Sequence, residues 1–171
     1  MKRALVILVL VGASVAFASS LGIPWFADVA APGSGWPPVE GTGPATIIYL
    51  KNNTPDIIEC EILYFNAAGM ELGPYGEDAT FEVQPNASLA FRPVQYDPNT
   101  EPGGQEDPES GLLVPDRPMG EDSPEPDGGR PNGSAVISWQ GGPNDIQGMI
   151  ATTGYGKGGM LSYAHLLPPG L

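Results

Sequence analysis

Apolar and polar residues alternate with a period of two in several short segments, and this pattern constrains the fold more than any other feature of the sequence. In residues 57–65 the apolar side chains occupy every second position, at Ile58, Cys60, Ile62 and Tyr64. Glu59 and Glu61 stand between them. Because successive side chains of a strand point to opposite faces, the pattern predicts a strand with one buried and one solvated face.

About seven such segments, rich in β-branched and aromatic residues, are separated by turn residues. They are 45–50, 57–65, 79–84, 88–92, 134–140, 146–152 and 160–167, with a shorter one at 70–72. No part of the sequence has an amphipathic pattern of helix length. Short alternating strands joined by turns predict an all-β domain over 44–171, an antiparallel β-sandwich of immunoglobulin-like size. A closed barrel is the alternative.

The predicted core consists of the inward-facing residues of these strands. They are Ile58, Ile62, Phe81, Leu89, Phe91, Ile137, Trp139, Ile150 and Tyr163. The chain has one cysteine, so no internal disulfide can form. Stability must therefore come from burial, which contributes about 1.5–3 kcal/mol for each large apolar side chain. Cys60 lies on the apolar face and is expected to be a buried thiol, with intermolecular pairing as the alternative.

The first 18 residues have the form of a signal peptide. Lys2 and Arg3 precede an uncharged apolar run over 4–18, and Ala16 and Ala18 supply the small residues of a cleavage site. We expect cleavage after Ala18. An uncleaved membrane anchor is the alternative, but the run is shorter than the roughly 20 residues that span a bilayer. No later stretch of the sequence is long and apolar enough to do so.

Net charge excludes one class of partner. Cleavage would remove two of the seven basic residues and leave five against 20 acidic ones, a net charge of −15. Such a surface repels nucleic acid and anionic lipid. An exported, acidic chain with one cysteine points to a secreted, extracellular or periplasmic protein, most simply of the bacterial envelope.

Residues 19–43 show neither strand nor helix periodicity and contain four prolines. We expect an extended or irregular arm. It carries Trp25, Phe26 and Trp36, and disordered tails are usually poor in aromatic residues. The arm is therefore expected to dock, either on its own domain or on the sheet edge of a neighbouring copy. In the second case, deletion of residues 20–43 would leave a folded monomer and abolish assembly.

Residues 95–131 form a long acidic loop rich in proline and glycine, with ten acidic residues. Its candidate calcium ligands are Asp97, Asn99, Glu101, Glu106, Asp107 and Glu109. The first three have the alternating spacing that opens an EF-hand loop, but Pro102 and Pro108 replace the glycine and the bidentate glutamate of that motif. The loop is either an irregular calcium site or simply solvated. We expect residues 112–114 in its middle to return to the core.

The sequence offers little for catalysis. His165 is the only histidine, and Ser162 falls on the opposite face of the same predicted strand. Residues 154–159 match GxGxxG but lead into another strand, so we expect a hairpin loop. The glycosylation sequons at 52–54, 86–88 and 132–134 are expected to be turns.

These features together predict a non-enzymatic structural or surface-assembly subunit, with filaments or other homo-oligomers as products and no cofactor. A calcium- or carbohydrate-binding extracellular module is the alternative. In that case the acidic loop would bind calcium, or exposed aromatic side chains would stack on sugar rings.

Overall fold

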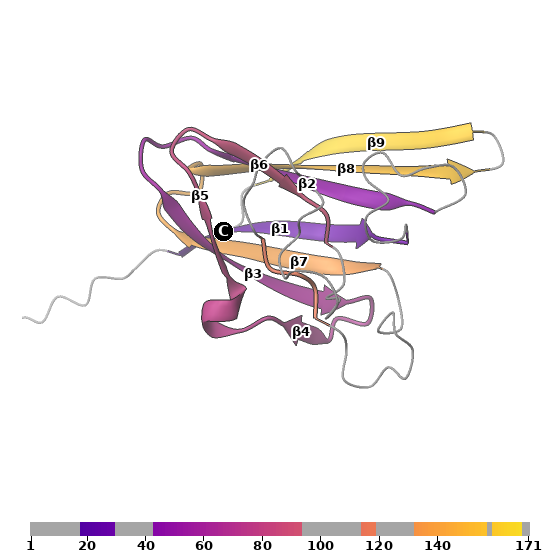
Figure 1. Ribbon diagram of the computed structural model, residues 1–171, viewed down its shortest axis with the longest axis horizontal. Helices are drawn as coiled ribbons and strands as arrows, with labels where there is room; N and C mark the ends of the chain where they lie inside the picture. The colour runs from indigo at the N-terminus through magenta and orange to yellow at the C-terminus, as the bar shows by residue number, and fades with distance from the viewer. Residues whose placement is uncertain (1–17, 30–42, 94–113, 119–131, 157–158, 169–171) are drawn as a thin grey trace, which may run out of the picture.

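The computed structural model describes residues 18–29, 43–93, 114–118, 132–156 and 159–168. Two antiparallel sheets pack face to face, one above the other in Figure 1. The predicted all-β sandwich is therefore confirmed. Within these ranges there is no helix long and apolar enough to cross a bilayer.

The lower sheet in Figure 1 has the order β1-β7-β3-β4, with β5 also paired to β3. Its strands are β1 (Ala18–Ala27), β3 (Ile58–Asn66), β4 (Glu71–Gly73), β5 (Thr80–Val83) and β7 (Asn132–Gln140). The first half of β3 pairs with β5 and its far end with β4. A short 3-10 turn, η1 (Gly76–Ala79), joins β4 to β5.

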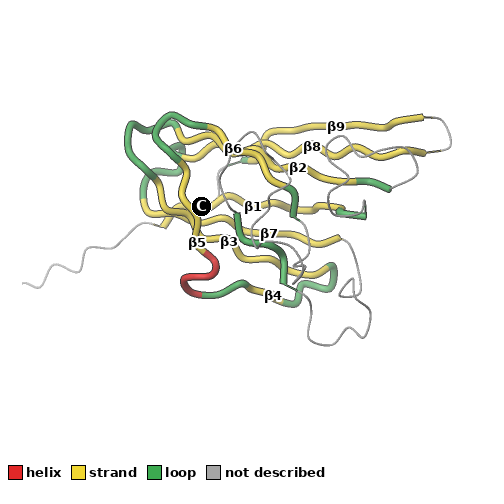
Figure 2. The backbone as a smooth tube through the Cα atoms, viewed as in Figure 1, coloured by secondary structure: helices red, strands yellow, loops and turns green. Residues whose placement is uncertain are grey.

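The second sheet has the order β6-β2-β8-β9. Its strands are β2 (Ala45–Asn52), β6 (Ser88–Phe91), β8 (Ile146–Gly156) and β9 (Gly159–Leu167). Figure 2 shows β8 and β9 as a long hairpin along one border of this sheet. The hairpin loop expected at 154–159 is shorter than predicted, because residues 154–156 belong to β8 and Gly159 begins β9. The segment does lead into another strand, as expected, and not into the helix of a nucleotide-binding turn.

Eight of the nine side chains predicted to form the core are buried, which confirms the prediction for them. All of these are at most 7% exposed: Ile58, Ile62, Phe81, Leu89, Phe91, Ile137, Trp139 and Ile150. Tyr163 is the exception, with 50% of its surface exposed. It lies on β9, the outermost strand of its sheet, and alternation assigns a side chain to a face without saying whether the opposite sheet reaches that far.

The first part of the arm docks on its own domain, which confirms one of the two alternatives expected, but it is a regular strand and not an irregular segment, because residues 18–27 form β1 and pair with β7 of the same chain. Leu21, Ile23 and Phe26 are at most 1% exposed and belong to the core. The pairing register shifts between Ile23 and Phe26, and this irregularity accommodates Pro24, which has no amide hydrogen to donate to the ladder.

A short piece of the acidic loop returns to the sandwich, as predicted. Val114 is fully buried in the core, while residues 112 and 113 lie outside the described ranges. The Tyr64 hydroxyl donates a hydrogen bond to the Pro115 carbonyl at 3.0 Å. The guanidinium of buried Arg117 lies 5.8 Å from the centre of the Phe26 ring, a cation–π contact. The segment 114–118 is thus fixed to β1 and β3.

A buried ion pair closes the sandwich beside this segment. Asp28 follows β1 and Arg92 follows β6, and their side chains meet with a nitrogen–oxygen distance of 2.5 Å. Both residues are at least 90% buried. Because an unpaired buried charge is strongly destabilising, the pair holds the ends of two strands from different sheets together.

Candidate functional site

The borders of the two sheets are the places where this fold can bind another backbone. Each sheet has two borders, formed by β1 and by β4 with β5 in one sheet, and by β6 and β9 in the other. An edge strand presents unpaired N–H and C=O groups, so soluble proteins shorten, kink or charge their edges. The four borders differ sharply in how far they are protected.

Three of the borders are short or irregular. β4 has three residues, and β5 and β6 have four each. β1 is longer but carries the register shift and Pro24. Such features limit the pairing of a second strand.

The border formed by β9 has none of these protections. It is nine residues long, contains no proline, and pairs with β8 in an unbroken register from Gly148↔Leu167 to Gly156↔Gly159. Its residues 162–166 are all exposed, those of one face as well as those of the other. Leu166 and Tyr163 have exposed fractions of 64% and 50%. Over 162–166 the strand is therefore open on both faces, and none of the strands that the structure describes pairs with its second backbone edge.

Two rings on β9 are already in contact. Tyr163 and His165 lie two residues apart on one face, and their rings are stacked with centroids 6.2 Å apart and an interplanar angle of 7°. His165 is opposite the buried Ile150 in the β8 register, whereas Ser162 is opposite Thr153 and lies on the other face. The separation of Ser162 from His165 that the sequence predicted is confirmed.

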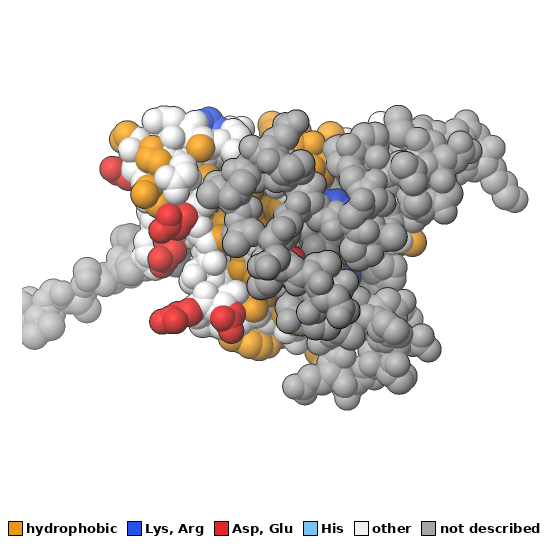
Figure 3. Space-filling view, in the orientation of Figure 1, with side chains coloured by type: hydrophobic (Ala, Val, Ile, Leu, Met, Phe, Trp, Pro, Cys, Tyr) orange, Lys and Arg blue, Asp and Glu red, His pale blue; other side chains and the backbone are white. Residues whose placement is uncertain are grey.

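Charge is distributed unevenly along the chain. Residues 146–171 contain none of the 20 acidic residues, and they carry Lys157 and His165. Six of the seven exposed acidic side chains of the described residues lie on β3, β4, η1 and β5, in or beside the other sheet: Glu59, Glu61, Glu71, Glu77, Asp78 and Glu82. The seventh, Asp56, lies in the loop between β2 and β3. Figure 3 shows acidic side chains together at the lower left, where η1 and β4 lie in Figure 1. The β9 edge is thus a neutral border on an acidic protein.

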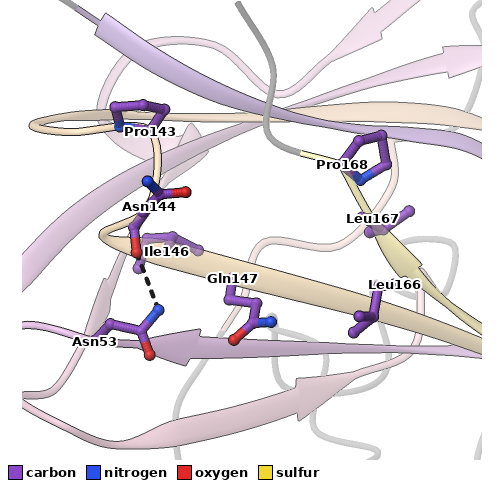
Figure 4. A pocket seen from close by; sticks show the side chains of 8 residues that line it. All are labelled: Asn53, Pro143, Asn144, Ile146, Gln147, Leu166, Leu167 and Pro168. Carbon is purple, nitrogen blue, oxygen red and sulfur yellow. Dashed lines mark hydrogen bonds between the residues drawn. The ribbon is translucent and has the colours of Figure 1, made fainter.

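A groove of about 540 Å³ lies at the end of β9. Its walls come from the end of β2, the β7–β8 turn, the start of β8 and the end of β9 (Figure 4). Asn53, Asn144 and Gln147 supply amide groups, and Leu166 and Pro168 supply apolar surface. No lining residue is ionisable. The groove can therefore accept hydrogen-bonding but uncharged groups, such as a peptide backbone, and has no acid or base for catalysis.

Hydrogen bonds fix the turn that forms one wall of the groove. The Gly142 amide donates to Asp145 Oδ2 at 2.6 Å, and Trp139 Nε1 donates to the Gly142 carbonyl at 3.0 Å. On the groove side, Asn53 Nδ2 donates to the Asn144 carbonyl at 3.0 Å, the dashed line in Figure 4. The wall of the groove is consequently fixed by hydrogen bonds between side chains and the backbone.

The three aromatic residues predicted to form an assembly arm do not lie in one place. Phe26 is buried in the core, where its ring meets the Tyr64 ring edge to face at 6.1 Å. Trp25 is 44% exposed on β1, and Trp36 lies outside the described residues. The structure therefore does not bring these three aromatic residues together as one surface.

The predicted calcium ligands all fall in 94–113, outside the described residues, so the calcium hypothesis stays a prediction. Among the residues that the structure does describe, no three His, Cys, Asp or Glu side chains are grouped to hold a metal ion. Glu59 and Glu61 are exposed on the outer face of β3, as predicted.

The structure also resolves the three sequons. Asn52 is fully buried with its amide engaged, and Asn86 occupies a turn with φ of 53°, a conformation that asparagine tolerates. The turn prediction is confirmed at Asn86, whereas at 52–54 Asn52 ends strand β2 and only residues 53 and 54 lie in the loop that follows. The turn prediction is wrong at 132–134, which begin strand β7.

Cys60 is a buried free thiol, as predicted, with 1% of its surface exposed. Burial raises the pKa of the Cys60 thiol to about 12, and the neighbouring Glu59 carboxylate adds to the increase. The thiol is therefore protonated, which makes it a poor nucleophile at neutral pH.

Sequence reasoning found the β9 strand but missed that it is an open edge. The available signal was the absence of acidic residues after Asp145 combined with a terminal strand that lacks proline. Local periodicity cannot distinguish an edge strand from a central one.

No family model matches the chain, and no curated protein matches it. A crystal structure of the Thermotoga maritima protein 1070 is similar, with a TM-score of 0.46 and 9% sequence identity over 87% of this chain and 91% of that chain. A similarity this distant says nothing about what the protein binds.

Proposed function

We propose that this protein is an exported, non-enzymatic structural subunit that assembles with other copies of itself through the β9 edge. The observation that carries the proposal is the state of that edge: nine residues in unbroken register, without proline or acidic residues, and exposed on both faces over 162–166. A second strand added there would gain a ladder of backbone hydrogen bonds, the mode known as β-augmentation.

The position of β1 supports export. The apolar run over 4–18 ends where β1 begins, so cleavage after Ala18 would leave Ser19–Ala27 available to complete the sheet. Ser19 contributes to that sheet end, because its hydroxyl donates to the Gly141 carbonyl at 2.7 Å. Mass spectrometry of the exported protein tests the cleavage site, and a mature chain that retained residues 4–18 would contradict it.

The same strand changes how assembly is expected to work. An arm that adds to a neighbour's sheet was one expectation from the sequence, but the first part of that arm completes the chain's own sheet. Deletion of residues 20–43 would remove Leu21, Ile23 and Phe26 from the core, so we expect an unfolded product rather than a folded monomer. We therefore place the assembly contact at β9.

The test is the oligomeric state of the mature chain, measured by sedimentation velocity over about a hundredfold range of concentration. We expect wild type to associate as its concentration rises and Ala164→Lys to stay monomeric, because a lysine on an open edge opposes strand addition. Val136→Lys is the matched control, since Val136 is 37% exposed but lies on the central strand β7.

Val136→Lys should associate like wild type, and melting curves should show that both variants remain folded. A wild-type chain that stays monomeric at every concentration would contradict the proposal. So would equal association of Ala164→Lys and wild type.

A further inference from the structure

The order of side chains along β9 is self-complementary about Ala164. Tyr163 and His165 flank it on one face, and Ser162 and Leu166 lie one position further out on the face that Ala164 shares. In an antiparallel pairing centred on Ala164, each Tyr163 is opposite His165 of the second copy, and each Ser162 is opposite Leu166. Such a pairing has two-fold symmetry and therefore closes on itself.

We infer that the occupant of the β9 edge is β9 of a second copy, antiparallel, with Ala164 opposite Ala164. The inference rests on the proposed function and makes it specific. It joins two four-stranded sheets into one continuous sheet of eight strands, which is within the size that open sheets reach.

The rings favour this register. Tyr163 and His165 are exposed and already stacked within one chain. Residues directly opposite one another on antiparallel strands have Cβ atoms about 4.5–5.5 Å apart, which brings aromatic rings into contact. Centring on Ala164 places a tyrosine opposite a histidine twice, so that four rings form one cluster. A shift by one residue in either direction breaks up both pairs.

The other face is compatible with the same register. Ser162 and Ala164 are small, so two copies can approach without a clash at the symmetry axis.

Charge favours a second copy at this border over any other border. Two mature chains each carry a net charge of −15 and repel one another wherever their acidic surfaces meet. Residues 146–171 hold no acidic residue, and all the exposed acidic side chains of the described residues lie on the other sheet or on η1 between two of its strands, except Asp56, which lies in the loop between β2 and β3. Pairing through β9 keeps those carboxylates apart. Added salt should strengthen the association, because it screens the remaining repulsion.

Cysteine cross-linking tests the register residue by residue, using the mature chain with oxidised glutathione as the electron acceptor. Opposed residues on antiparallel strands have Cα atoms about 4.5–5.5 Å apart, within the range for a disulfide. Ala164→Cys should therefore form a covalent dimer. Ser162→Cys alone should not, since the two copies of residue 162 would be four strand positions apart, or about 13 Å.

A mixture of Ser162→Cys and Leu166→Cys should cross-link, because the register places these positions opposite each other. We expect at least about tenfold more covalent dimer from Ala164→Cys, and from the mixture, than from Ser162→Cys alone. The wild-type chain is the control, since its only cysteine is the buried Cys60.

The outcomes separate this inference from the proposed function. Cross-linking in the predicted pattern supports both. Association by sedimentation with a different pattern, for example Ser162→Cys cross-linking as well as Ala164→Cys, would overturn the register and leave the proposed assembly standing. A monomeric wild-type chain without any cross-link would overturn both, and would leave the edge to a partner of another kind.

Discussion

Asn52 joins the two sheets, and its replacement gives a direct test of the fold. It is the last residue of β2 and is fully buried. Its Nδ2 donates to the carbonyls of Asp56 at 2.7 Å, Val83 at 3.0 Å and Gln84 at 3.1 Å. Its Oδ1 accepts from the amide and the hydroxyl of Thr54, both at 2.8 Å. One side chain thus connects the end of β2 to the end of β5 in the opposite sheet.

The expected loss follows from these partners. In Asn52→Ala the buried Val83 carbonyl loses the hydrogen bond that it accepts from this side chain. The loss of such a bond at a buried group costs about 1–3 kcal/mol. The other partners are partly exposed to water and contribute less, about 0.5 kcal/mol each. With four such hydrogen bonds the total is about 3–5 kcal/mol, which would lower the melting temperature by about 6–20 °C for a domain of this size.

Its neighbour Asn53 is the matched control. The exposed Asn53 side chain makes one hydrogen bond, to the Asn144 carbonyl, so Asn53→Ala should cost less than about 1 kcal/mol. Urea denaturation followed by tryptophan fluorescence measures both variants, because Trp139 is buried in the core. Equal stabilities for Asn52→Ala and Asn53→Ala would refute the assignment of Asn52 as the connection between the sheets.

Asn52→Asp adds a pH dependence with a definite sign. The carboxylate would face the carbonyls of Asp56, Val83 and Gln84, so burial and repulsion should raise its pKa above the unfolded value of about 3.9. Relative to wild type, the variant should be most stable below that unfolded pKa and lose stability as the pH rises through the folded pKa. A stability difference between Asn52→Asp and wild type that did not change with pH would contradict the predicted increase in the pKa of the new carboxyl group.

Three further predictions concern the core. Iodoacetamide should label Cys60 only after unfolding, and labelling of the native protein at pH 8 would contradict this. The free energy of unfolding should also fall as the pH rises from about 9 to about 12. The reason is that the folded state retains the thiol proton that the unfolded chain loses near pH 9. Gly133→Ala should destabilise the fold by about 1–3 kcal/mol, because a Cβ there would stand 2.2 Å from a backbone oxygen. In the control variant Gly22→Ala the added Cβ meets nothing within 4 Å, so this change should leave the stability unchanged. Thermal unfolding measures both variants. Phe26→Ala should lower the free energy of unfolding, measured by urea denaturation, by about 3–5 kcal/mol. Trp25→Ala, at a half-exposed position, should lower it much less. A larger loss for Trp25→Ala than for Phe26→Ala would contradict the placement of β1.

Much of the fold could be predicted because strand periodicity is a local property. The alternation in 57–65 gave both the strand and its buried face, and Cys60 and Ile62 are buried as the pattern required. β1 could not be predicted in the same way, because Pro24 and Trp25 interrupt the alternation where the pairing register shifts. Its strand character comes from the pairing partner β7, which lies more than a hundred residues later in the sequence.

The candidate site was harder to predict, because it depends on which strand lies at a border. Tyr163 and Ile150 look equally apolar in a strand pattern, yet Ile150 is buried on β8 and Tyr163 is half exposed on β9. What differs between them is the order of strands in the sheet, and no short stretch of sequence contains that order. The predicted calcium ligands depend in the same way on loop conformation, which residue spacing alone does not determine.

The placement of the basic residues gives the β9 edge its importance. Of the five basic residues left after cleavage, Arg92 and Arg117 are buried inside the sandwich. Arg92 neutralises the buried Asp28 and Arg117 contacts the Phe26 ring, so they do little to offset the exposed acidic side chains of the described residues. Copies of such a protein repel one another over most approaches, since like charges act over about 10 Å at moderate salt. An acid-free border is therefore where association costs the least electrostatic free energy, and β9 combines that property with a free hydrogen-bonding edge.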